Sequence, residues 1–420
     1  MKICLVTAFP PSGRQLNEYG FHLANALRQN SHVELTILAD ELARYDFATK
    51  ADGTLFGHEH RNELADFDVI RCWQCNHIDN PLRIAQAIRK AKPDVVWFNL
   101  VFSSFAAQDH PVAAFAGLCT PALTRAMGYY THITLHHILE HVNFADAGIK
   151  HERLFRLSAN LATRTLLRAN SVTVLLSPYQ KTLTEKYSAK NVLLGTHGIF
   201  TPNPTPPDFS RRGNPEHRIL AIGHWGTYKR LETLMAAFPA ILKRIPNARL
   251  IVAGANHHNK PGYWESVREK NRAIPNIEFR GYVAEDQIPE LFQTSSILVT
   301  PYDSATGSSG PAHQACEYGL PIVSADLPDF RAMADDEDMA ISFYKTGNAP
   351  ELADRISQIL ESPSLQRSMG QYNFAAALRM TMPNVVRHYL RWFELEKCRK
   401  DIEAKPQVER EIIDGVMSRV

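Results

Sequence analysis

The feature that most constrains the fold is a regular alternation between short apolar runs and longer helical patterns. Seven such runs lie within residues 1–200, at Ile3–Val6, Val33–Leu38, Val69–Trp73, Val95–Leu100, Ile133–Leu135, Val172–Leu176 and Val192–Leu194. Many are apolar at successive positions, which is typical of strands buried on both faces of a sheet. After the first run, Leu16, Gly20, Leu23 and Leu27 recur at helical spacing and predict a helix over Asn17–Arg28.

A second alternating series follows a proline-rich stretch. Residues 202–215 contain five prolines, which is the composition of a linker. The later apolar runs are Ile219–Ile222, Leu250–Ala253, Ile277–Phe279, Ile297–Thr300, Ile322–Ser324 and Ala340–Phe343. Helical patterns fit between them at Leu231–Leu242 and Gln287–Phe292, and another begins near Asn384. Two strand–helix series joined by a linker predict an α/β protein with two doubly wound, Rossmann-like domains that face each other.

These patterns also set the expected domain boundaries. We expect a first domain over residues 1–200, a linker over 201–216, a second domain over 217–380, and a returning C-terminal helix with a charged tail over 381–420. Ligands in such folds bind beyond the carboxyl ends of the strands. The candidate binding loops are therefore those that follow Val6, Leu135, Ile222, Phe279 and Thr300.

Charge and cysteine content narrow the classes of function. The chain has 46 basic and 44 acidic residues, a net charge of +2, and this balance gives no case for a nucleic-acid partner. No apolar run approaches the roughly 18 residues of a membrane span, and MKICLVTAFPP is read as a strand rather than a signal peptide. Six scattered cysteines are typical of reduced thiols, so a cytoplasmic location is expected.

The stretch 301–321, PYDSATGSSGPAHQACEYGLP, contains the strongest candidate for a binding loop. Gly307 and Gly310 allow close approach of a ligand, and Ser308 and Ser309 are able to cap a helix or bind a hydroxyl. Pro311 suits the first turn of a helix. Free backbone N–H groups at such a helix N-terminus attract anions. An ordinary cap and turn without a ligand explains this stretch equally well.

Basic residues follow the first strand of the second series, in GHWGTYKRLETL. His224 lies close to the end of the run Ile219–Ile222, and Lys229 and Arg230 lie near the start of the next helix. Cations there would meet a phosphate at the same strand-end crevice. A lone Lys-Arg pair is more often a solvated helix face, and its shared location with the loop at 301–321 favours the phosphate interpretation.

Two loops of the first series are candidates on the opposite side of that crevice. His136 ends a strand and is expected to point into the crevice, with His137 facing the other way by strand alternation. Ser12 and Gly13 precede the first helix and form a possible second cradle for polar groups. A histidine that ends a strand is more often structural than functional.

Several other patterns are weighed and set aside. Cys72-Trp73-Gln74-Cys75 has no second pair for zinc, and Asp336-Glu337-Asp338 is interpreted as a loop, so no metal site is expected. No GxGxxG follows the first strand and no P-loop motif is present. The basic amphipathic segment Lys150–Arg168 is able to lie on an anionic membrane, but a solvated helix face is the favoured interpretation, so peripheral membrane contact is possible but not indicated.

Together these residues resemble the family-4 retaining glycosyltransferases of the two-domain GT-B fold, over about residues 1–395. In that family the second domain opens with a strand, Gly-Arg-Leu and then Lys-Gly. Gly223 and Lys229 match this pattern, whereas His224 and Arg230 replace the arginine and the second glycine. The stretches NIEFRGYVAEDQIPELFQTSSILVTPY and GLPIVSADLPDF resemble the later strands of the family's second domain.

Two histidines extend the resemblance to the first domain, and one signature departs from it. His197-Gly198 is similar to the family's His-Gly pair at the end of the first domain, and His136 resembles its strand-end histidine that contacts the donor sugar. The family has two glutamates separated by seven residues, and here Thr306 and Gln314 take their places. In the family these glutamates hold sugar and ribose hydroxyls. Gln314 is still able to bond a ribose.

The resemblance implies transfer of a hexose from a nucleotide-diphosphate sugar to an alcohol acceptor, with retention of configuration and with no metal or other cofactor. Lys229 and the loop amides would stabilise the charge that develops on the leaving diphosphate, whose oxygen takes the acceptor's proton. Lys229 and His136 are the implied catalytic residues. The implied donor-binding residues are Gly13, Gly223, His224, Arg230, Tyr282, Thr306, Gly307, Ser308, Ser309, Gly310 and Gln314.

Two other functions stay open at this point. The first is a different enzyme on a doubly wound fold, such as an oxidoreductase, which the missing glycine fingerprint disfavours. The second is a sugar-nucleotide-binding protein that has lost catalysis together with both glutamates. Binding of nucleotides without turnover would favour the second.

Overall fold

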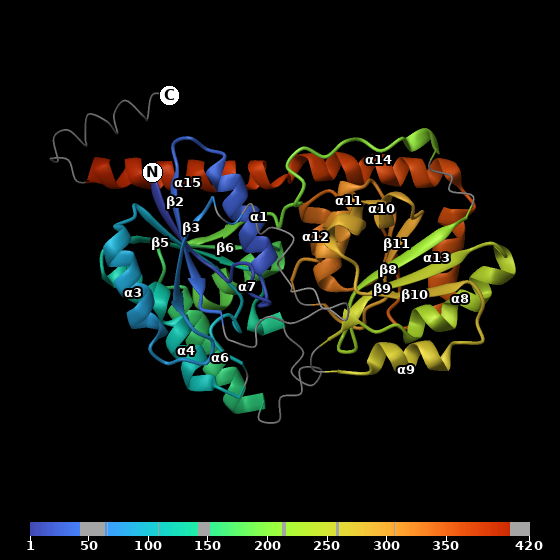
Figure 1. The fold of residues 1–420 in the computed structure, drawn as a ribbon, viewed down its shortest axis with the longest axis horizontal. Coiled ribbons are helices and arrows are strands. Elements are labelled where there is room, and N and C mark those ends of the chain that lie inside the picture. The colour runs from blue at the N-terminus through green and yellow to red at the C-terminus, as the bar shows by residue number, and fades with distance from the viewer. Residues whose placement is uncertain are drawn as a thin grey trace.

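Two parallel β-sheets, one in each half of the chain, form the framework of the computed structural model (Figure 1). The structure describes residues 1–42, 64, 66–107, 109–141, 152–211, 216–257, 260–305 and 307–403. Within these residues, the first sheet has seven strands in the order β3-β2-β1-β4-β5-β6-β7, and the second has six in the order β10-β9-β8-β11-β12-β13. Neighbouring strands in both sheets run parallel.

Each apolar run predicted to be a strand corresponds to one of these strands. The first sheet contains β1 (Lys2–Val6), β2 (Glu34–Asp40), β3 (Asp68–Trp73), β4 (Val95–Leu100), β5 (Tyr130–Leu135), β6 (Ser171–Val174) and β7 (Val192–Leu194). The second contains β8 (Arg218–Trp225), β9 (Arg249–Asn256), β10 (Ile277–Gly281), β11 (Ile297–Thr300), β12 (Ile322–Ala325) and β13 (Ile341–Tyr344). The central strands are buried along their whole length, as the unbroken apolar runs predicted.

Helices connect successive strands and cover both sheets (Figure 1). Those of the first half are α1 (Asn17–Arg28), α3 (Asn80–Ala91), α4 (Pro111–Leu118), α5 (Thr120–Ala126), α6 (Glu152–Leu166) and α7 (Ser177–Tyr187). Those of the second half are α8 (Glu232–Arg244), α9 (Tyr263–Lys270), α10 (Ile288–Gln293), α11 (Gly310–Glu317), α12 (Pro328–Asp336), α13 (Ala349–Leu360), α14 (Pro363–Arg379) and α15 (Met382–Glu403). The predicted pair of doubly wound α/β units is confirmed.

The last helix of the described chain returns to the first domain (Figure 1). On α15, Val386, Tyr389 and Phe393 are buried, and the Tyr389 ring lies 4.4 Å from the ring of Trp97 in β4. The chain therefore passes between the domains twice, once after β7 and once before α15. Most of the predicted charged tail lies outside the described residues.

Strand β8 is longer than the sequence predicted. Gly223 and His224 were expected to follow the strand, but they pair with Gly254 and Ala255 of β9. The reason is Trp225, which is fully buried and donates its indole Nε1–H to the carbonyl oxygen of Ala253 at 2.8 Å. This anchor holds three more residues in the ladder, so the loop that leads to Lys229 begins after Trp225.

The strand order places the candidate loops at one face of each sheet. In the first sheet the order reverses between β1 and β4, and in the second it reverses between β8 and β11. Ligands of doubly wound folds bind at the carboxyl ends of the strands around such a reversal. Loops after β1, β5, β8 and β11 all begin at that edge of their sheets.

Candidate functional site

The loop that follows β11 begins beside Lys229. Tyr302 forms an isolated antiparallel bridge with Lys229, and the N–H of Asp303 donates to the Tyr228 carbonyl at 2.9 Å. These backbone bonds fasten the loop after β8 to the loop after β11. The sequence placed Lys229 and the glycine-serine loop in one crevice, and the structure does bring their segments together.

Gly307 corrects one part of the sequence interpretation. Its N–H was expected to be free for a ligand, but it donates to the hydroxyl oxygen of Tyr179 at 2.6 Å and to the Asp329 carboxylate at 3.0 Å. Tyr179 belongs to α7 of the first domain, and its own hydroxyl donates to Asp329 at 2.6 Å. The Gly307 amide therefore joins the two domains and has no capacity left for a phosphate.

Close packing explains why a glycine stands at this position. Gly307 has φ +85°, and a Cβ there would lie 2.6 Å from the carbonyl oxygen of His136. Any other residue would face both backbone strain and a collision. The end of β5 in the first domain and the loop after β11 in the second domain are thus in direct contact.

The next three residues carry polar groups that have no partner among the described residues. Within that part of the chain, the buried hydroxyls of Ser308 and Ser309 make no hydrogen bond, and no acceptor faces the N–H groups of Ser308, Ser309 or Gly310. Ser309 precedes α11 and makes no side-chain cap. A Cβ on Gly310 would have nothing within 4 Å. An anion that accepted these hydrogen bonds would remove the cost of leaving them unmade.

Thr306 and Gln314 stand at the two positions where the resemblance implies glutamates. Thr306 lies outside the described residues. Gln314 is partly buried on α11, and its carbonyl oxygen accepts the N–H of Tyr318 at 3.1 Å. Glu317, which the sequence analysis did not assign, is buried and accepts a hydrogen bond from Thr201 of the linker. Burial raises the pKa of the Glu317 carboxyl.

Lys229 lies in an aromatic setting. Its Nζ is 4.9 Å from the centre of the Tyr302 ring and 5.9 Å from that of Tyr228, distances at which a cation is attracted to an aromatic face. Within the described part of the chain, no carboxylate forms an ion pair with it. Burial lowers the pKa of Lys229 to about 8. A phosphate would supply the counter-charge that the protein itself does not place there.

Other predicted donor-binding residues near Lys229 differ in their surroundings. Arg230 is exposed and lies 3.4 Å from Glu232 and 3.5 Å from Asp303, so carboxylates already balance its charge. His224 is exposed, and Tyr282 is 44% exposed. Gly223 is closest to Lys229, because a Cβ on it would lie 3.6 Å from Lys229 Cδ and from the Tyr302 hydroxyl.

His136 is buried at the end of β5. Its Nε2 lies 2.7 Å from Asn99 Oδ1, and Asn99 donates its own Nδ2–H to Thr7 Oγ1 at 3.0 Å. This second bond turns the Asn99 oxygen toward His136, so His136 Nε2 carries the proton and Nδ1 is left as an acceptor. Burial, together with His197 and His137, lowers the pKa of His136 well below its ordinary value. The imidazole is therefore neutral.

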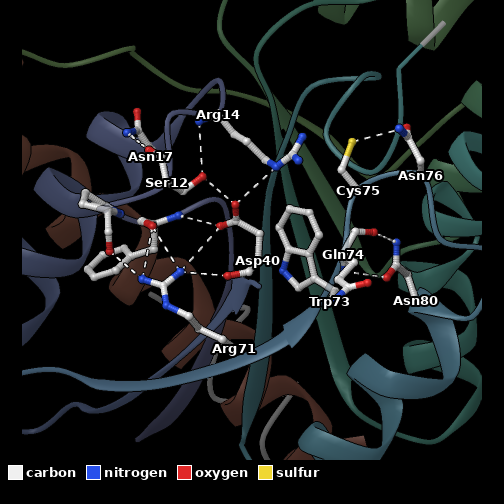
Figure 2. A network of polar contacts seen from close by, with 12 residues as sticks. Ser12, Arg14, Asn17, Asp40, Arg71, Trp73, Gln74, Cys75, Asn76 and Asn80 are labelled. Atoms are coloured by element: carbon white, nitrogen blue, oxygen red, sulfur yellow. Dashed lines mark hydrogen bonds and ion pairs between the residues drawn. The ribbon is translucent and has the colours of Figure 1, made fainter. Parts of the chain in front are cut away.

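The loop after β1, with Ser12 and Gly13, is closed by the protein itself (Figure 2). Ser12 donates its hydroxyl to the buried carboxylate of Asp40 at 2.5 Å, and Phe9 N–H donates to the same carboxylate at 3.2 Å. Arg71 donates to the Pro10 carbonyl at 2.6 Å and to the Asp40 carbonyl at 2.8 Å. Gly13 is exposed. The cradle predicted here is filled by side chains from β2 and β3.

The acidic triplet Asp336-Glu337-Asp338 is not the simple loop that the sequence predicted. Asp336 ends α12 and accepts the N–H of Ser177 in the first domain at 2.7 Å, and Glu337 is buried. Asp338 pairs with Arg379 at 3.0 Å. The triplet therefore joins the second domain to the first through Asp336 and to α14 through Asp338.

Two observations concern metals and membranes. Within the described residues, no group of three or more histidine, cysteine or acidic side chains is arranged to hold a metal ion. Among the helices of the same part of the chain, none combines the length and apolarity that a membrane crossing requires. On α6 the exposed side chains include Arg156, Leu157, Leu161 and Arg164.

Sequence reasoning missed the contacts that fix the site. Tyr179 and Asp329 lie 150 residues apart in the chain and meet only in the fold. His313 and Glu337 form a buried pair beneath Ser309, with Nε2 and Oε2 2.8 Å apart. A weak signal was present, because His313 and Gln314 are polar residues in a helix segment that also contains Ala312, Ala315 and Cys316.

Comparison with known proteins agrees with this architecture. Residues 216–362 match the family described as glycosyl transferases group 1. An uncharacterized glycosyltransferase of Haemophilus influenzae is 22% identical over 223 residues, which are 51% of this chain and 60% of that protein. The match thus spans less than two thirds of that relative's length.

Solved structures resemble the chain over nearly its full length. HepE from Anabaena, in complex with UDP and glucose, has a TM-score of 0.65 at 15% identity and covers 94% of this chain and 99% of its own. Sucrose-phosphate synthase from Thermosynechococcus elongatus has a TM-score of 0.67 at 14% identity, with coverage of 95% and 99%. The predicted resemblance to glycosyltransferases is confirmed: the chain has the GT-B fold, and its residues 216–362 match the glycosyl transferases group 1 family.

Proposed function

We propose that this chain is a glycosyltransferase that moves a hexose from a nucleoside-diphosphate sugar to a hydroxyl acceptor, with retention of configuration and without a metal ion. The observation that carries the proposal is that Lys229, a partly buried cation in an aromatic setting, bridges to Tyr302 at the start of the loop that carries the unfilled donors of Ser308, Ser309 and Gly310. The family match and the UDP-bound structural relatives support the same class of donor.

The chemistry follows from where charge develops. As the glycosidic bond breaks, negative charge grows on the leaving diphosphate. Lys229 and the amides of residues 308–310 would stabilise this charge, and each well-placed donor contributes about 2–4 kcal/mol to lowering the barrier. The Gly307 amide is excluded from this role because Tyr179 and Asp329 occupy it.

His136 serves the donor sugar rather than the proton transfer. The neutral ring presents Nδ1 as an acceptor, which suits a sugar hydroxyl, and its low pKa makes it a poor general base. In a same-face mechanism the leaving phosphate oxygen takes the acceptor's proton. Retention then requires no carboxylate nucleophile, which fits a donor loop with Gln314 in place of a glutamate.

The hydrogen bonds that the Asp40 carboxylate already accepts disfavour a dinucleotide-dependent enzyme. An acidic residue after the second strand binds the ribose in dinucleotide domains. Here Asp40 accepts hydrogen bonds from Ser12 and Phe9, and lies 3.4 Å from Arg14. The carboxylate is saturated by the protein and is buried.

The cytoplasmic location belongs to the proposal as well. All six cysteines are free thiols, including the buried Cys4 and Cys316, which suits a reducing compartment. The near-zero net charge again gives no case for nucleic acid.

The deciding experiment compares Lys229→Ala with the exposed control Lys243→Ala. Calorimetry with UDP and GDP should show binding to the native protein and to the control, and a loss of about 100-fold or more in Lys229→Ala. Transfer from UDP-glucose or GDP-mannose to a panel of alcohols should fall in parallel. Unchanged nucleotide affinity in a folded Lys229→Ala protein would refute the phosphate role, and binding without any turnover would favour the non-catalytic alternative.

A further inference from the structure

A buried histidine–glutamate pair lies under the candidate donor loop. His313 of α11 places Nδ1 2.8 Å from the Ser309 carbonyl oxygen and Nε2 2.8 Å from Glu337 Oε2. Both side chains are almost completely buried, with exposures of 2% and 1%. Because both side chains are shielded from solvent, any effect of the pair on a ligand must pass through the residues that contact it.

The hydrogen bonds fix how many protons the pair holds. The Ser309 carbonyl is only an acceptor, so His313 Nδ1 must carry a proton. A carboxylate is also only an acceptor, so the contact between Nε2 and Oε2 requires a second proton, on the ring or on the carboxyl group. The pair therefore holds one proton more than a neutral histidine beside an ionised glutamate.

Glu337 extends the pair to the first domain. Its other oxygen, Oε1, accepts the N–H of His197 at 3.2 Å, and the carbonyl oxygen of His197 accepts the hydroxyl of Tyr19 at 3.0 Å. The ring of Tyr19 stands edge-on to His136, with 4.5 Å between ring centres. A continuous series of contacts thus runs from the Ser309 carbonyl to the strand end that holds His136.

The geometry of the peptide group shows what the pair can control. In a trans peptide the carbonyl oxygen and the following N–H point in opposite directions. The Ser309 oxygen accepts two hydrogen bonds from His313, one from its backbone N–H at 3.1 Å and one from Nδ1 at 2.8 Å, so the N–H of Gly310 is directed away from His313. Gly310 is also where a Cβ would meet open space.

We propose that the His313–Glu337 pair is a proton-dependent positioning element, which aims the Gly310 amide at the donor diphosphate and couples that aim to the first domain through His197. The proposal rests on the donor site described above. With the second proton in place, the loop, Glu337 and the His197 amide form one connected unit. When that proton is lost, Nε2 and the carboxylate are two acceptors facing each other, and the connection to the first domain breaks.

The direction of the pH effect follows from the surroundings of the pair. Burial lowers the pKa of His313, but the charge and hydrogen bond of Glu337 and the Ser309 carbonyl raise it, and the net shift is upward. The other titratable groups that face the pair are His197, whose ring lies 4.6 Å from that of His313, Cys316 of α11 and Tyr19 of α1. Burial keeps the last two protonated and His197 neutral, with a pKa of about 4. The pair therefore keeps its second proton to a higher pH than a free histidine would, and loses it as pH rises further.

Glu337→Gln supplies a matched variant that keeps the shape. A glutamine oxygen would still accept the His197 N–H, and its amide nitrogen would donate to His313 Nε2, leaving Nδ1–H on the Ser309 carbonyl. This variant preserves the connections without the extra proton. His313→Leu removes both side-chain connections, leaves the backbone N–H of residue 313 on the Ser309 carbonyl, and puts an apolar side chain of similar volume in place of the ring.

The test measures UDP affinity from pH 6 to pH 9.5 in the native protein and both variants. At pH 7 we expect Glu337→Gln to bind UDP within threefold of the native protein and His313→Leu to bind about tenfold more weakly, the weight of one hydrogen bond. The ratio of native to Glu337→Gln dissociation constants should rise with pH, since contributions from Lys229 and from the nucleotide cancel in it.

The outcomes separate the two proposals. A flat ratio across the pH range, or native affinity in His313→Leu, would overturn the positioning role even if UDP binds well. If the native protein binds neither UDP nor GDP, the donor site itself fails. The pair is then judged by amide hydrogen exchange in residues 307–312, which must be faster in His313→Leu than in Glu337→Gln at pH 7 for the positioning role to stand.

Discussion

Two loops with similar residues, one in each domain, differ in whether the protein satisfies their polar groups. We call the loop after β1 the closed loop and the loop before α11 the open loop. Ser12-Gly13 follows β1, and Ser308-Ser309-Gly310 leads into α11; both lie at the carboxyl edge of a parallel sheet. In the first loop, Asp40 of β2 and Arg71 of β3 satisfy the polar groups. In the second, two buried hydroxyls and three amides have no partner among the described residues. Glycine and serine thus permit a binding site, and distant side chains decide whether it stays open.

The difference has a physical basis in which side chain follows the neighbouring strand. In the first domain the strand beside β1 ends in Asp40, whose charge draws in Ser12, Arg14 and Arg71 (Figure 2). In the second domain the strand beside β8 ends with Gly254-Ala255-Asn256, which carries no charge. Gly254 itself is required there, because a Cβ would lie 1.9 Å from the Gly223 carbonyl oxygen.

The largest effect on stability should come from removing the carboxylate of Asp40, which satisfies the polar groups of the closed loop. Asp40→Ala leaves the Ser12 hydroxyl and the Phe9 amide without their acceptor, and it removes the carboxylate that lies beside Arg14 and Arg71. We expect a loss of about 3 kcal/mol in the free energy of unfolding, measured by urea denaturation. UDP affinity should stay within threefold at temperatures where the variant is folded. A variant that loses UDP affinity while keeping its stability would place the donor site in the wrong domain.

A side chain added to the open loop should instead reduce donor binding and transfer, and leave the stability of the fold unchanged. In Gly310→Val the new side chain enters space that no described atom occupies, so the melting temperature should change little. If a diphosphate binds there, transfer from a sugar nucleotide should fall on the order of 100-fold, as for the loss of one charge-stabilising donor. Gly13→Val, at the exposed position of the closed loop, is the matched control and should transfer normally. Equal activity in both variants would remove the functional difference between the loops.

A smaller effect concerns the protonation of Lys229. Burial lowers its pKa from 10.5 to about 8, and an anion favours the charged form. UDP affinity should therefore fall by up to about tenfold per pH unit above pH 8 in the Glu337→Gln background. Without ligand the sign for stability is the reverse: the unfolded chain binds more protons between pH 8 and 10.5, so the free energy of unfolding gains a contribution that increases with pH.

The stability part of this prediction has its own control. Lys229→Met keeps the length of the side chain and removes the titration. The difference in unfolding free energy between the native protein and Lys229→Met should change between pH 8 and pH 10 and be constant below pH 7.5. A difference that does not vary with pH would mean that the lysine is well solvated in the free protein.

The sequence predicted the framework far better than it predicted which polar groups are free. All the strands in the described part of the chain were predicted, because a strand buried on both faces needs an unbroken apolar run, which is a local signal. Candidate binding loops could be proposed for the same reason, since the loops at strand ends were known once the strands were known. The occupied Gly307 amide was missed because its partners, Tyr179 and Asp329, are brought there only by domain packing.

The acidic triplet Asp336-Glu337-Asp338 is a second case in which domain packing, and not the local sequence, determines whether a polar group has partners. Asp336-Glu337-Asp338 was interpreted as a loop, which is where charged residues usually lie. Glu337 is buried because His313 and the His197 amide give it hydrogen bonds from two different domains. No pattern within ten residues of Glu337 contains that information, whereas the long β8 could have been inferred from Trp225, an aromatic residue that favours strands.

The smallest expected effect is that of removing divalent cations. In the open loop the positive charge for a diphosphate comes from Lys229, together with the N-terminal end of α11, and so from the chain itself. Transfer from a sugar nucleotide after treatment with EDTA should therefore stay within twofold of its untreated value. A decisive comparison adds Lys229→Ala with and without Mg²⁺. If the native protein loses activity in EDTA and Mg²⁺ restores it, the lysine and the amides are insufficient, and the open loop must bind its anion together with a metal.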